Sequence, residues 1–234
     1  EEGISDKMTL TVEAGSIAGV PYGGTQFGAA ANAQCIIPHN VQFDFYQGGG
    51  LDVAFLGLAE TAPNGDLNVS KFGTRLAGAG GFIDITQNVK KLCFIGTFTA
   101  GKQEVKIKGD GLAIHAQGPR KKFLEQVEAI TFSGREALKK GQEVWYITER
   151  AVFRLEEEGL TLVEIAHGVD LQLDILDQME FSPVIQEYVR YMDPRLFRDS
   201  PMGMNPEQME VLEPEYEFWR DLRPPKPSAE KEEN

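Results

Sequence analysis

The feature that most constrains the fold is a series of short apolar runs separated by glycines. The run "LDVAFLGLA" (51–59) follows three consecutive glycines, and "KKLCFIGTF" (90–98) is a second run of the same kind. Both are far shorter than the roughly 18 apolar residues that a membrane-spanning helix needs. Nearly continuous apolar runs of this length are typical of strands that are buried on both faces, as in a parallel sheet.

The second half of the chain carries two further signals. The segment 142–166 predicts at least two strands, with a turn at Glu158–Gly159. The segment 169–179 has helical spacing, and Asp170 is a candidate N-cap for that helix. These segments add strands and a helix to the two buried runs.

The beginning of the chain predicts a strand and then a helix. Residues 8–12 alternate between apolar and polar side chains and predict a strand that ends at Glu13. The stretch "TQFGAAANAQCI" is rich in small residues and predicts a helix that begins at Thr25. Glu13 is then expected at the carboxyl end of a strand, where open α/β sheets gather their ligands.

Together these elements predict an α/β fold with an open, mostly parallel sheet flanked by helices. From about Ser200 the composition changes, because residues 201–234 hold six of the twelve prolines, and acids outnumber bases nine to four. We therefore predict one domain over residues 1–199 and an extended, acidic, proline-rich tail over residues 200–234. Phe218 and Trp219 indicate that part of the tail docks, either on this chain or on a partner.

Charge and composition exclude several classes of function. The formal net charge of −13 argues against a nucleic-acid partner, whose phosphates it would repel. No apolar segment is long enough for a membrane span, and the acidic first residues are unlike a signal peptide. Cys35 and Cys93 lie among apolar neighbours and are expected to be buried, reduced thiols of a cytoplasmic protein. The three histidines are scattered singly, so no metal site is expected.

One carboxylate, Glu13, stands among five glycines in the stretch "LTVEAGSIAGVPYGGTQFG" (10–28). Glycines expose backbone N–H groups and let a bulky ligand approach the backbone closely. Position alone leaves three roles open for Glu13: a solvated loop acid or cap, a general acid or base, or a covalent nucleophile.

A second glycine cluster, "GAGGF", contains Gly78, Gly80 and Gly81. The third glycine of a dinucleotide-binding GxGxxG motif is absent, so that function is not indicated. The cluster fits an ordinary structural turn, and it equally fits an oxyanion site built from backbone N–H groups. The residues alone do not choose between these two interpretations.

Seven stretches resemble a known family when they are taken together and in order. They cover most of residues 10–199: "TVEAGSIAGVPYGGTQFG", "FDFYQGGGLDVAFLGLAE", "GDLNVSKFG", "GAGGFIDI", "YITERAVFRL", "GLTLVEIA" and "MDPRLFRD". The sequence resembles the C-terminal half of the family I coenzyme A transferases, of the acetoacetate/propionate type that has both halves on one long chain. Other branches carry Ser-Glu-Asn-Gly where this sequence has Val12–Gly15 (Val-Glu-Ala-Gly), which fits the propionate-type branch.

The resemblance implies that Glu13 is the nucleophile of an acyl-CoA:carboxylate CoA-transferase. The implied route is ping-pong and passes through a covalent 5-glutamyl coenzyme A thioester on Glu13. The resemblance also implies an oxyanion and CoA-binding role for the glycine cluster Gly78, Gly80 and Gly81. Phe27 and Asn32 lie in a family-like stretch and are weaker candidates for the acyl pocket, with structural packing as the alternative.

The resemblance further implies the partners of the chain. Coenzyme A is expected as a co-substrate, with no permanently bound cofactor and no metal. The expected partners are acyl-CoA, a short carboxylate, and an N-terminal half supplied as a separate or cleaved chain, without which the chain is inactive. A homo-oligomer that acts in short-chain fatty acid or ketone body metabolism is implied as well.

Two alternatives compete with the transferase. An acyl-CoA hydrolase on the same scaffold would use water in place of the acceptor carboxylate. A non-catalytic interaction module would keep the fold, with Glu13 as an ordinary loop acid and the acidic tail as a partner-binding segment.

Overall fold

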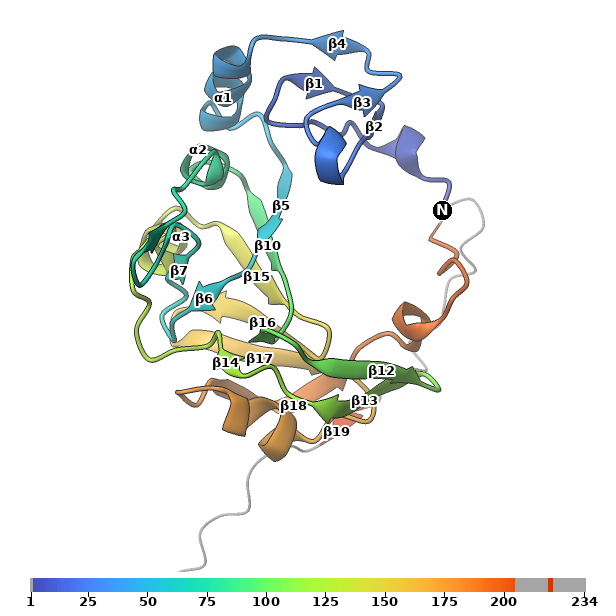
Figure 1. The fold of residues 1–234 in the computed structure, drawn as a ribbon, viewed down its shortest axis with the longest axis vertical. Coiled ribbons are helices and arrows are strands. Elements are labelled where there is room, and N and C mark those ends of the chain that lie inside the picture. The colour runs from blue at the N-terminus through green and yellow to red at the C-terminus, as the bar shows by residue number, and fades with distance from the viewer. Residues whose placement is uncertain (1, 205–218, 221–234) are drawn as a thin grey trace, which may run out of the picture.

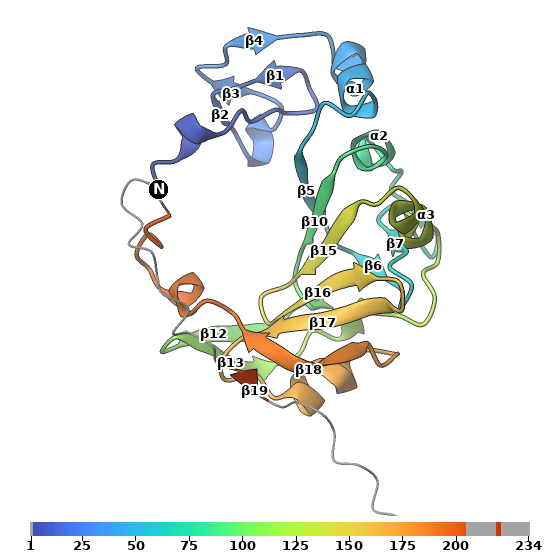
Figure 2. The ribbon, with the colours of Figure 1, turned by 180° about the vertical axis from the view of Figure 1, so that it is seen from behind.

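The computed structural model describes residues 2–204 and 219–220, and it divides them into two parts. A small N-terminal lobe (residues 2–47) lies above a larger body that is built on a seven-stranded sheet (Figure 1). Residues 192–204 turn back toward the N-terminus (Figure 2), where the Met204 N–H donates to the Glu2 carboxylate at 2.9 Å. Within the described ranges, the search for a helix long and apolar enough to cross a membrane finds none.

The central sheet has the strand order β19-β18-β17-β16-β15-β10-β5. Its strands are β5 (Val53–Gly57), β10 (Lys91–Ile95), β15 (Glu143–Ile147), β16 (Ala151–Glu156), β17 (Gly159–Ile165), β18 (Val184–Tyr191) and β19 (Trp219–Arg220). Both apolar runs of the sequence are therefore strands, and they are neighbours in the sheet. The segment 142–166 forms three strands, in agreement with the prediction of at least two.

The α/β class is confirmed, but the sheet is mixed rather than mostly parallel. The contacts β5–β10, β10–β15 and β17–β18 are parallel, whereas β15–β16, β16–β17 and β18–β19 are antiparallel. The connections explain the difference, because only residues 148–150 separate β15 from β16 and only Glu157–Glu158 separate β16 from β17. A parallel crossover needs a dozen or more residues.

Two short helices cover one face of the parallel strands. The helix α2 (Phe82–Thr86) lies in the crossover between β5 and β10, and α3 (Gly134–Lys139) lies in the one between β10 and β15. Beneath them Phe94 of β10 stacks on Phe82 with ring centroids 5.6 Å apart and contacts Tyr146 at 5.3 Å. These buried aromatic contacts fix the position of α2 on the sheet.

Short hairpins and helical turns complete the body. Hairpins pair β6 (Glu60–Thr61) with β7 (Leu67–Asn68), β8 (Lys71–Phe72) with β9 (Arg75–Leu76), and β12 (Glu104–Lys108) with β13 (Gly111–Ala116). The strands β11 (Thr99–Ala100) and β14 (Arg120–Lys121), which flank the last of these hairpins in the chain, form an antiparallel pair. The helical turns are the π-helical η3 (Leu171–Ile175) and the 3-10 helices η4 (Leu176–Gln178) and η5 (Pro194–Phe197). The Asp170 side chain accepts from the Leu173 N–H, which confirms the predicted N-cap.

The N-terminal lobe consists of very short elements. They are η1 (Ser5–Lys7), β1 (Ser16–Ile17), β2 (Val20–Pro21), η2 (Gly24–Gln26), β3 (Ala30–Ala31), β4 (Cys35–Ile36) and the helix α1 (His39–Gln47). The Gln47 side chain donates to the Asp84 carboxylate on α2, and this bond ties the lobe to the body. The lobe is thus held through α1, the helix that precedes β5.

Several predictions for this lobe are wrong. Residues 8–12 form no strand, because the chain reverses at Glu13 and leaves a single bridge between Thr11 and Ile17. The predicted helix at Thr25 is only the turn η2, since Gly28 follows with a φ of +99°. Cys35 is exposed rather than buried, because β4 is a short outer strand of a two-stranded pair.

The tail is described only in part. Phe218 lies outside the described residues, whereas Trp219–Arg220 forms β19 and pairs with Val189–Arg190 of β18. This pairing agrees with a tail that docks on its own chain. The boundary between residues 199 and 200 stays a prediction.

The structure buries a lysine, and this gives a prediction for the pH dependence of stability. Lys122 is 7% exposed, and its ammonium group donates to the Thr97 carbonyl at 2.7 Å. Burial lowers the pKa of Lys122 to about 8, although the Glu149 carboxylate acts in the opposite direction. Between this pKa and the ordinary value of 10.5, the folded state holds fewer protons at Lys122 than the unfolded state. The free energy of unfolding is therefore expected to rise with pH across this window, by about 3 kcal/mol.

The matched control is Lys122→Met, which keeps an unbranched side chain of similar length and removes its charge. Urea unfolding of both proteins from about pH 7 to 10.5 isolates the contribution of Lys122, because the other titrating groups are shared. Identical pH profiles for the two proteins would contradict the prediction.

Candidate active site

Glu13 lies at the tip of a tight turn rather than at the end of a strand. The Gly15 N–H donates to the Val12 carbonyl at 2.9 Å and closes the turn Val12–Gly15. Gly15 has a φ of +114°, and a Cβ added there would lie 2.0 Å from the Ile37 carbonyl oxygen. Only glycine fits this position, so the sequence Glu-Ala-Gly dictates a turn that presents the Glu13 side chain.

The helix α1 supports the Glu13 turn from one side. Nδ1 of His39, the first residue of α1, lies 2.9 Å from the Glu13 carbonyl oxygen. Phe43 lies one helical turn further on, and its ring meets the His39 ring edge to face at 4.5 Å. The two rings therefore form one wall beside Glu13.

Gly81 lies against both the Glu13 carboxylate and the Phe43 ring. A Cβ added at Gly81 would lie 2.5 Å from Oε2 of Glu13 and 2.6 Å from Cζ of Phe43. The carboxylate, the aromatic ring and the glycine backbone thus converge on one point, although they come from three separate segments. The Glu13 side chain is half-buried there.

The glycine cluster divides into a structural and a free part. The Gly78 N–H donates to the Ser70 carbonyl at 3.0 Å and closes the β8–β9 hairpin. In the described part of the chain, the N–H groups of Gly80 and Gly81 donate to no other group. Gly81 is also the N-cap of α2. A free backbone donor therefore lies next to the carboxylate, whereas the Gly78 amide is already engaged.

A buried polar network beneath the Glu13 turn was missed in the sequence. The Gln42 amide donates to the Tyr46 hydroxyl at 2.7 Å, and this hydroxyl donates to Oγ1 of Thr11 at 2.9 Å. Gln42 is fully buried and Tyr46 almost so. The spacing of Gln42 and Tyr46, four residues apart on α1, is the only local signal that points to this network. It fixes α1 against the segment that leads to Glu13.

The two acyl-pocket candidates lie differently. Phe27 is 65% exposed, and it precedes Gly28, where an added Cβ would lie 3.0 Å from the Cβ of Ala14. Phe27 is therefore next to the Glu13 turn, with its ring uncovered. Asn32 is exposed, has a φ of +56°, and lies beside the Gly19 backbone in the β2–β3 hairpin. The structure thus brings Phe27, but not Asn32, to the turn that carries Glu13.

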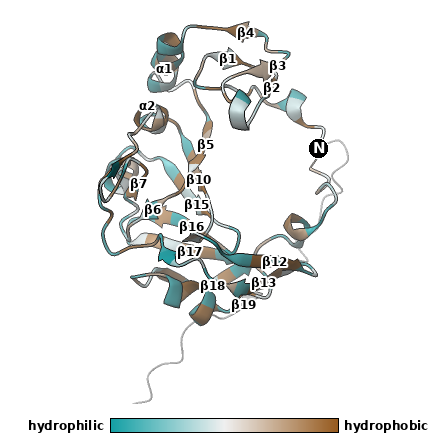
Figure 3. Cartoon of the chain, in the orientation of Figure 1, coloured by the Kyte–Doolittle hydropathy of each residue, from teal (hydrophilic) through white to brown (hydrophobic). Residues whose placement is uncertain are grey.

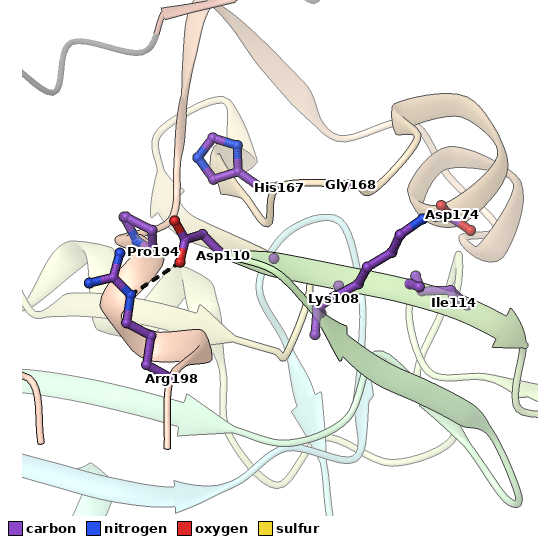
Figure 4. A pocket seen from close by; sticks show the side chains of 11 residues that line it. Lys108, Asp110, Ile114, His167, Gly168, Asp174, Pro194 and Arg198 are labelled. Atoms are coloured by element: carbon purple, nitrogen blue, oxygen red, sulfur yellow. Dashed lines mark hydrogen bonds and ion pairs between the residues drawn. The ribbon is translucent and has the colours of Figure 1, made fainter. Parts of the chain in front are cut away.

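A separate cavity of about 720 Å³ lies between the β12–β13 hairpin and η5 (Figure 4). Asp110 and Arg198 form an ion pair of 3.1 Å at its edge, and His167 stacks on Tyr191 nearby. None of its lining residues belongs to the N-terminal lobe, so it is not part of the Glu13 site.

Known proteins resemble this chain over most of its length. No protein-family model matches the chain. It is 51% identical over 203 residues to the acetate CoA-transferase YdiF of Escherichia coli, which covers 87% of this chain and 38% of that protein. It is 47% identical over 210 residues to the caffeate CoA-transferase of Acetobacterium woodii, which covers 88% of this chain and 40% of that protein.

Solved structures show the same relation. The apo crystal structure of the E. coli O157:H7 acyl-CoA transferase YdiF superimposes with a TM-score of 0.81 at 50% identity, over 86% of this chain and 38% of that chain. A second crystal structure of that enzyme, described as a thioester complex with CoA, gives 0.82 over 87% of this chain and 38% of that one. The decarboxylase AibA/AibB has a TM-score of 0.59 at 19% identity over 78% of this chain and 70% of that one, and shows the fold alone.

The alignments also limit what is shared. This chain spans 38–40% of the length of the two curated relatives. The similarity in sequence and fold applies only to that part of each relative. Over the residues that it shares with these relatives, the chain is similar in sequence and fold to CoA-transferases, in agreement with the resemblance that its motifs carry.

Proposed function

We propose that this chain carries the catalytic glutamate of a short-chain acyl-CoA:carboxylate CoA-transferase, and that Glu13 forms a covalent glutamyl-CoA thioester. The observation that carries the proposal is the close approach of both the Glu13 carboxylate and the Phe43 ring to Gly81, in a chain 51% identical to an acetate CoA-transferase. The related E. coli enzyme has been crystallised as a thioester complex with CoA, which supports this chemistry.

The reaction follows from carboxylate chemistry. The Glu13 carboxylate attacks the thioester carbonyl of acyl-CoA and expels the CoA thiolate, which leaves a mixed anhydride. The thiolate then attacks the glutamyl carbonyl and expels the acyl carboxylate, which leaves glutamyl-CoA. An acceptor carboxylate enters, and the two steps run in reverse. Because one thioester replaces another, the exchange needs no ATP.

The residues around Glu13 have separate tasks in this scheme. Each tetrahedral intermediate carries an oxyanion, and Gly81, whose N–H donates to no described group, lies beside the carboxylate, with Gly80 next to it in the chain. Loss of one such donor typically costs about 2.7–4 kcal/mol of barrier. The Phe43 ring limits access of water to the anhydride, and His39 holds the backbone of Glu13.

The remaining parts of the proposal concern partners. The whole activity requires the region of the enzyme that corresponds to the unaligned length of the relatives, which we assign to an N-terminal half. The two relatives are named for acids of very different size, acetate and caffeate, although this chain is about equally similar to both. We therefore assign the choice of acid mainly to the N-terminal half. The two described cysteines are unpaired, which supports a reducing compartment such as the cytoplasm.

The decisive experiment uses a hybrid protein in which this chain replaces the 203 aligned residues of the E. coli acetate CoA-transferase. After incubation with acetyl-CoA, mass spectrometry of the peptide that contains Glu13 is expected to show the added mass of CoA. Borohydride treatment is expected to abolish activity, because it reduces the glutamyl thioester. Acetyl transfer to a second carboxylate without any modification of Glu13 would refute the proposal, and release of free acid without an acceptor would indicate a hydrolase.

A further inference from the structure

One face of the central sheet is apolar and exposed around its β5 edge. Val53 and Phe55 of β5 are 39% and 68% exposed, and Ile95 of β10 is 46% exposed. The strand register places Phe55 and Trp145 on either side of Cys93, and Ile95 beside Ile147. We call six residues the apolar sheet face: the exposed Val53, Phe55 and Ile95, the half-buried Trp145 and Ile147, and the buried Cys93 at their centre.

The alternation of the strands explains why this face is uncovered. Ala54, Phe94 and Tyr146 point to the opposite side, where α2 and α3 cover the sheet, and they are buried. No helix in the described ranges covers the apolar sheet face (Figure 1). In Figure 3 the strand β5 carries brown, apolar positions, and β5 is also the edge of the sheet. Natural proteins rarely leave an apolar edge strand open.

Charged residues surround the apolar centre. Lys91 and Glu143 form an ion pair of 3.0 Å, and Arg154 pairs with Glu156 on the neighbouring strand. The cationic groups of Lys91 and Arg154 each lie 5.8 Å from the Trp145 ring. An apolar, aromatic centre within a polar rim is the usual anatomy of a protein–protein interface.

We propose that the apolar sheet face docks the region of the CoA-transferase that corresponds to the unaligned part of the relatives, and this inference rests on the proposed function. About 60% of each relative lies outside the aligned region, which is ample to cover such a face. The helix α1 leads through residues 48–52 directly into β5, so a partner on this face contacts the strand that follows the helix supporting Glu13.

Two other occupants fit less well. The described end of the tail, Trp219–Arg220, lies beside β18 at the opposite edge of the sheet from β5. A second copy of this chain would bring two net charges of −13 together. Neither the position of the tail nor the repulsion between two copies counts against the third occupant, the region that corresponds to the unaligned part of the relatives.

The test co-expresses the tagged full chain with the E. coli acetate CoA-transferase region outside the aligned 203 residues, and measures complex formation by affinity capture and light scattering. The unchanged chain is expected to form a 1:1 complex. Phe55→Glu and Ile95→Lys are expected to weaken the complex by at least about 30-fold, as for residues at the centre of an interface. Ile130→Glu is the control, because Ile130 is 63% exposed and lies outside this face.

Circular dichroism of the isolated variants checks that they fold. Unchanged binding by both face variants would overturn the inference, as would equal weakening by Ile130→Glu. Absence of any complex, or a homodimer that the face variants disrupt, would overturn the proposed occupant. The hybrid protein separates this result from the proposed function, because its two regions are covalently joined and its Glu13 adduct does not depend on docking of separate chains.

Discussion

Replacing Glu13 by Gln in the hybrid protein is expected to lower kcat by about 10⁴-fold or more. An amide is a very poor nucleophile toward a thioester, so neither the anhydride nor the glutamyl-CoA can form. The substitution preserves size, and the Val12–Gly15 turn is held by backbone bonds, so the melting temperature is expected to change little. Steady-state rates and the mass of the Glu13 peptide are the two measurements.

Glu13→Asp tests the position of the same group. The carboxylate would retreat from Gly81 by the length of one methylene, and a misplacement of this order costs about 100-fold in rate. Glu157→Gln is the matched control, because Glu157 is an exposed acid in the β16–β17 turn and is expected to leave the rate unchanged. If Glu13→Gln kept more than about a tenth of the activity, Glu13 would not be the nucleophile.

The parts of the fold that could be predicted from sequence are those that depend on local signals. The run 90–98 contains β10 because Leu92 and Phe94 are buried in the core, and Asp170 caps η3 through a side chain three residues from its partner. Strand direction was harder, because it depends on whether a connection holds a helix. The run 51–59 shows the limit, since its composition does not reveal that β5 is an edge strand with one face uncovered.

The N-terminal lobe could not be predicted for a related reason. Its strands pair across only two residues each, and glycines with positive φ reverse the chain before a regular pattern develops. The alternation of residues 8–12 predicts a strand, yet only Thr11 bridges to a partner. Short, glycine-rich hairpins depend on contacts such as that of Gly15 with the Ile37 carbonyl, and no local pattern encodes these contacts.

The candidate site shows the same division between chemistry and geometry. Glu13 and the glycine cluster are visible in the sequence as separate features, but their contact comes from the packing of α1 and α2. The different roles of the glycines in the cluster are also visible only in the structure, because Gly78 closes a hairpin whereas Gly81 lies beside the Glu13 carboxylate.

Gly81→Ala is expected to lower kcat of the hybrid protein by about 100-fold, with little change in stability. The new Cβ would lie 2.5 Å from Oε2 of Glu13 and 2.6 Å from the Phe43 ring, so the carboxylate must move from its position. The backbone at Gly81 has a φ of −80°, which alanine adopts without strain, and the loss therefore comes from the site itself. A displacement of about 1 Å at a reacting group is enough for a loss of this size.

The matched control for Gly81→Ala is Gly23→Ala. Gly23 lies in the same lobe as Glu13, has a φ of −105°, and has no neighbouring atom within 4 Å of an added Cβ. Its replacement is expected to leave both kcat and the rate of glutamyl-CoA formation unchanged. Because Gly81→Ala alters the position of the nucleophile, the rate of adduct formation in a single turnover is expected to fall as much as kcat does. Equal activity of the two alanine variants would mean that Glu13 does not react from the position beside Gly81.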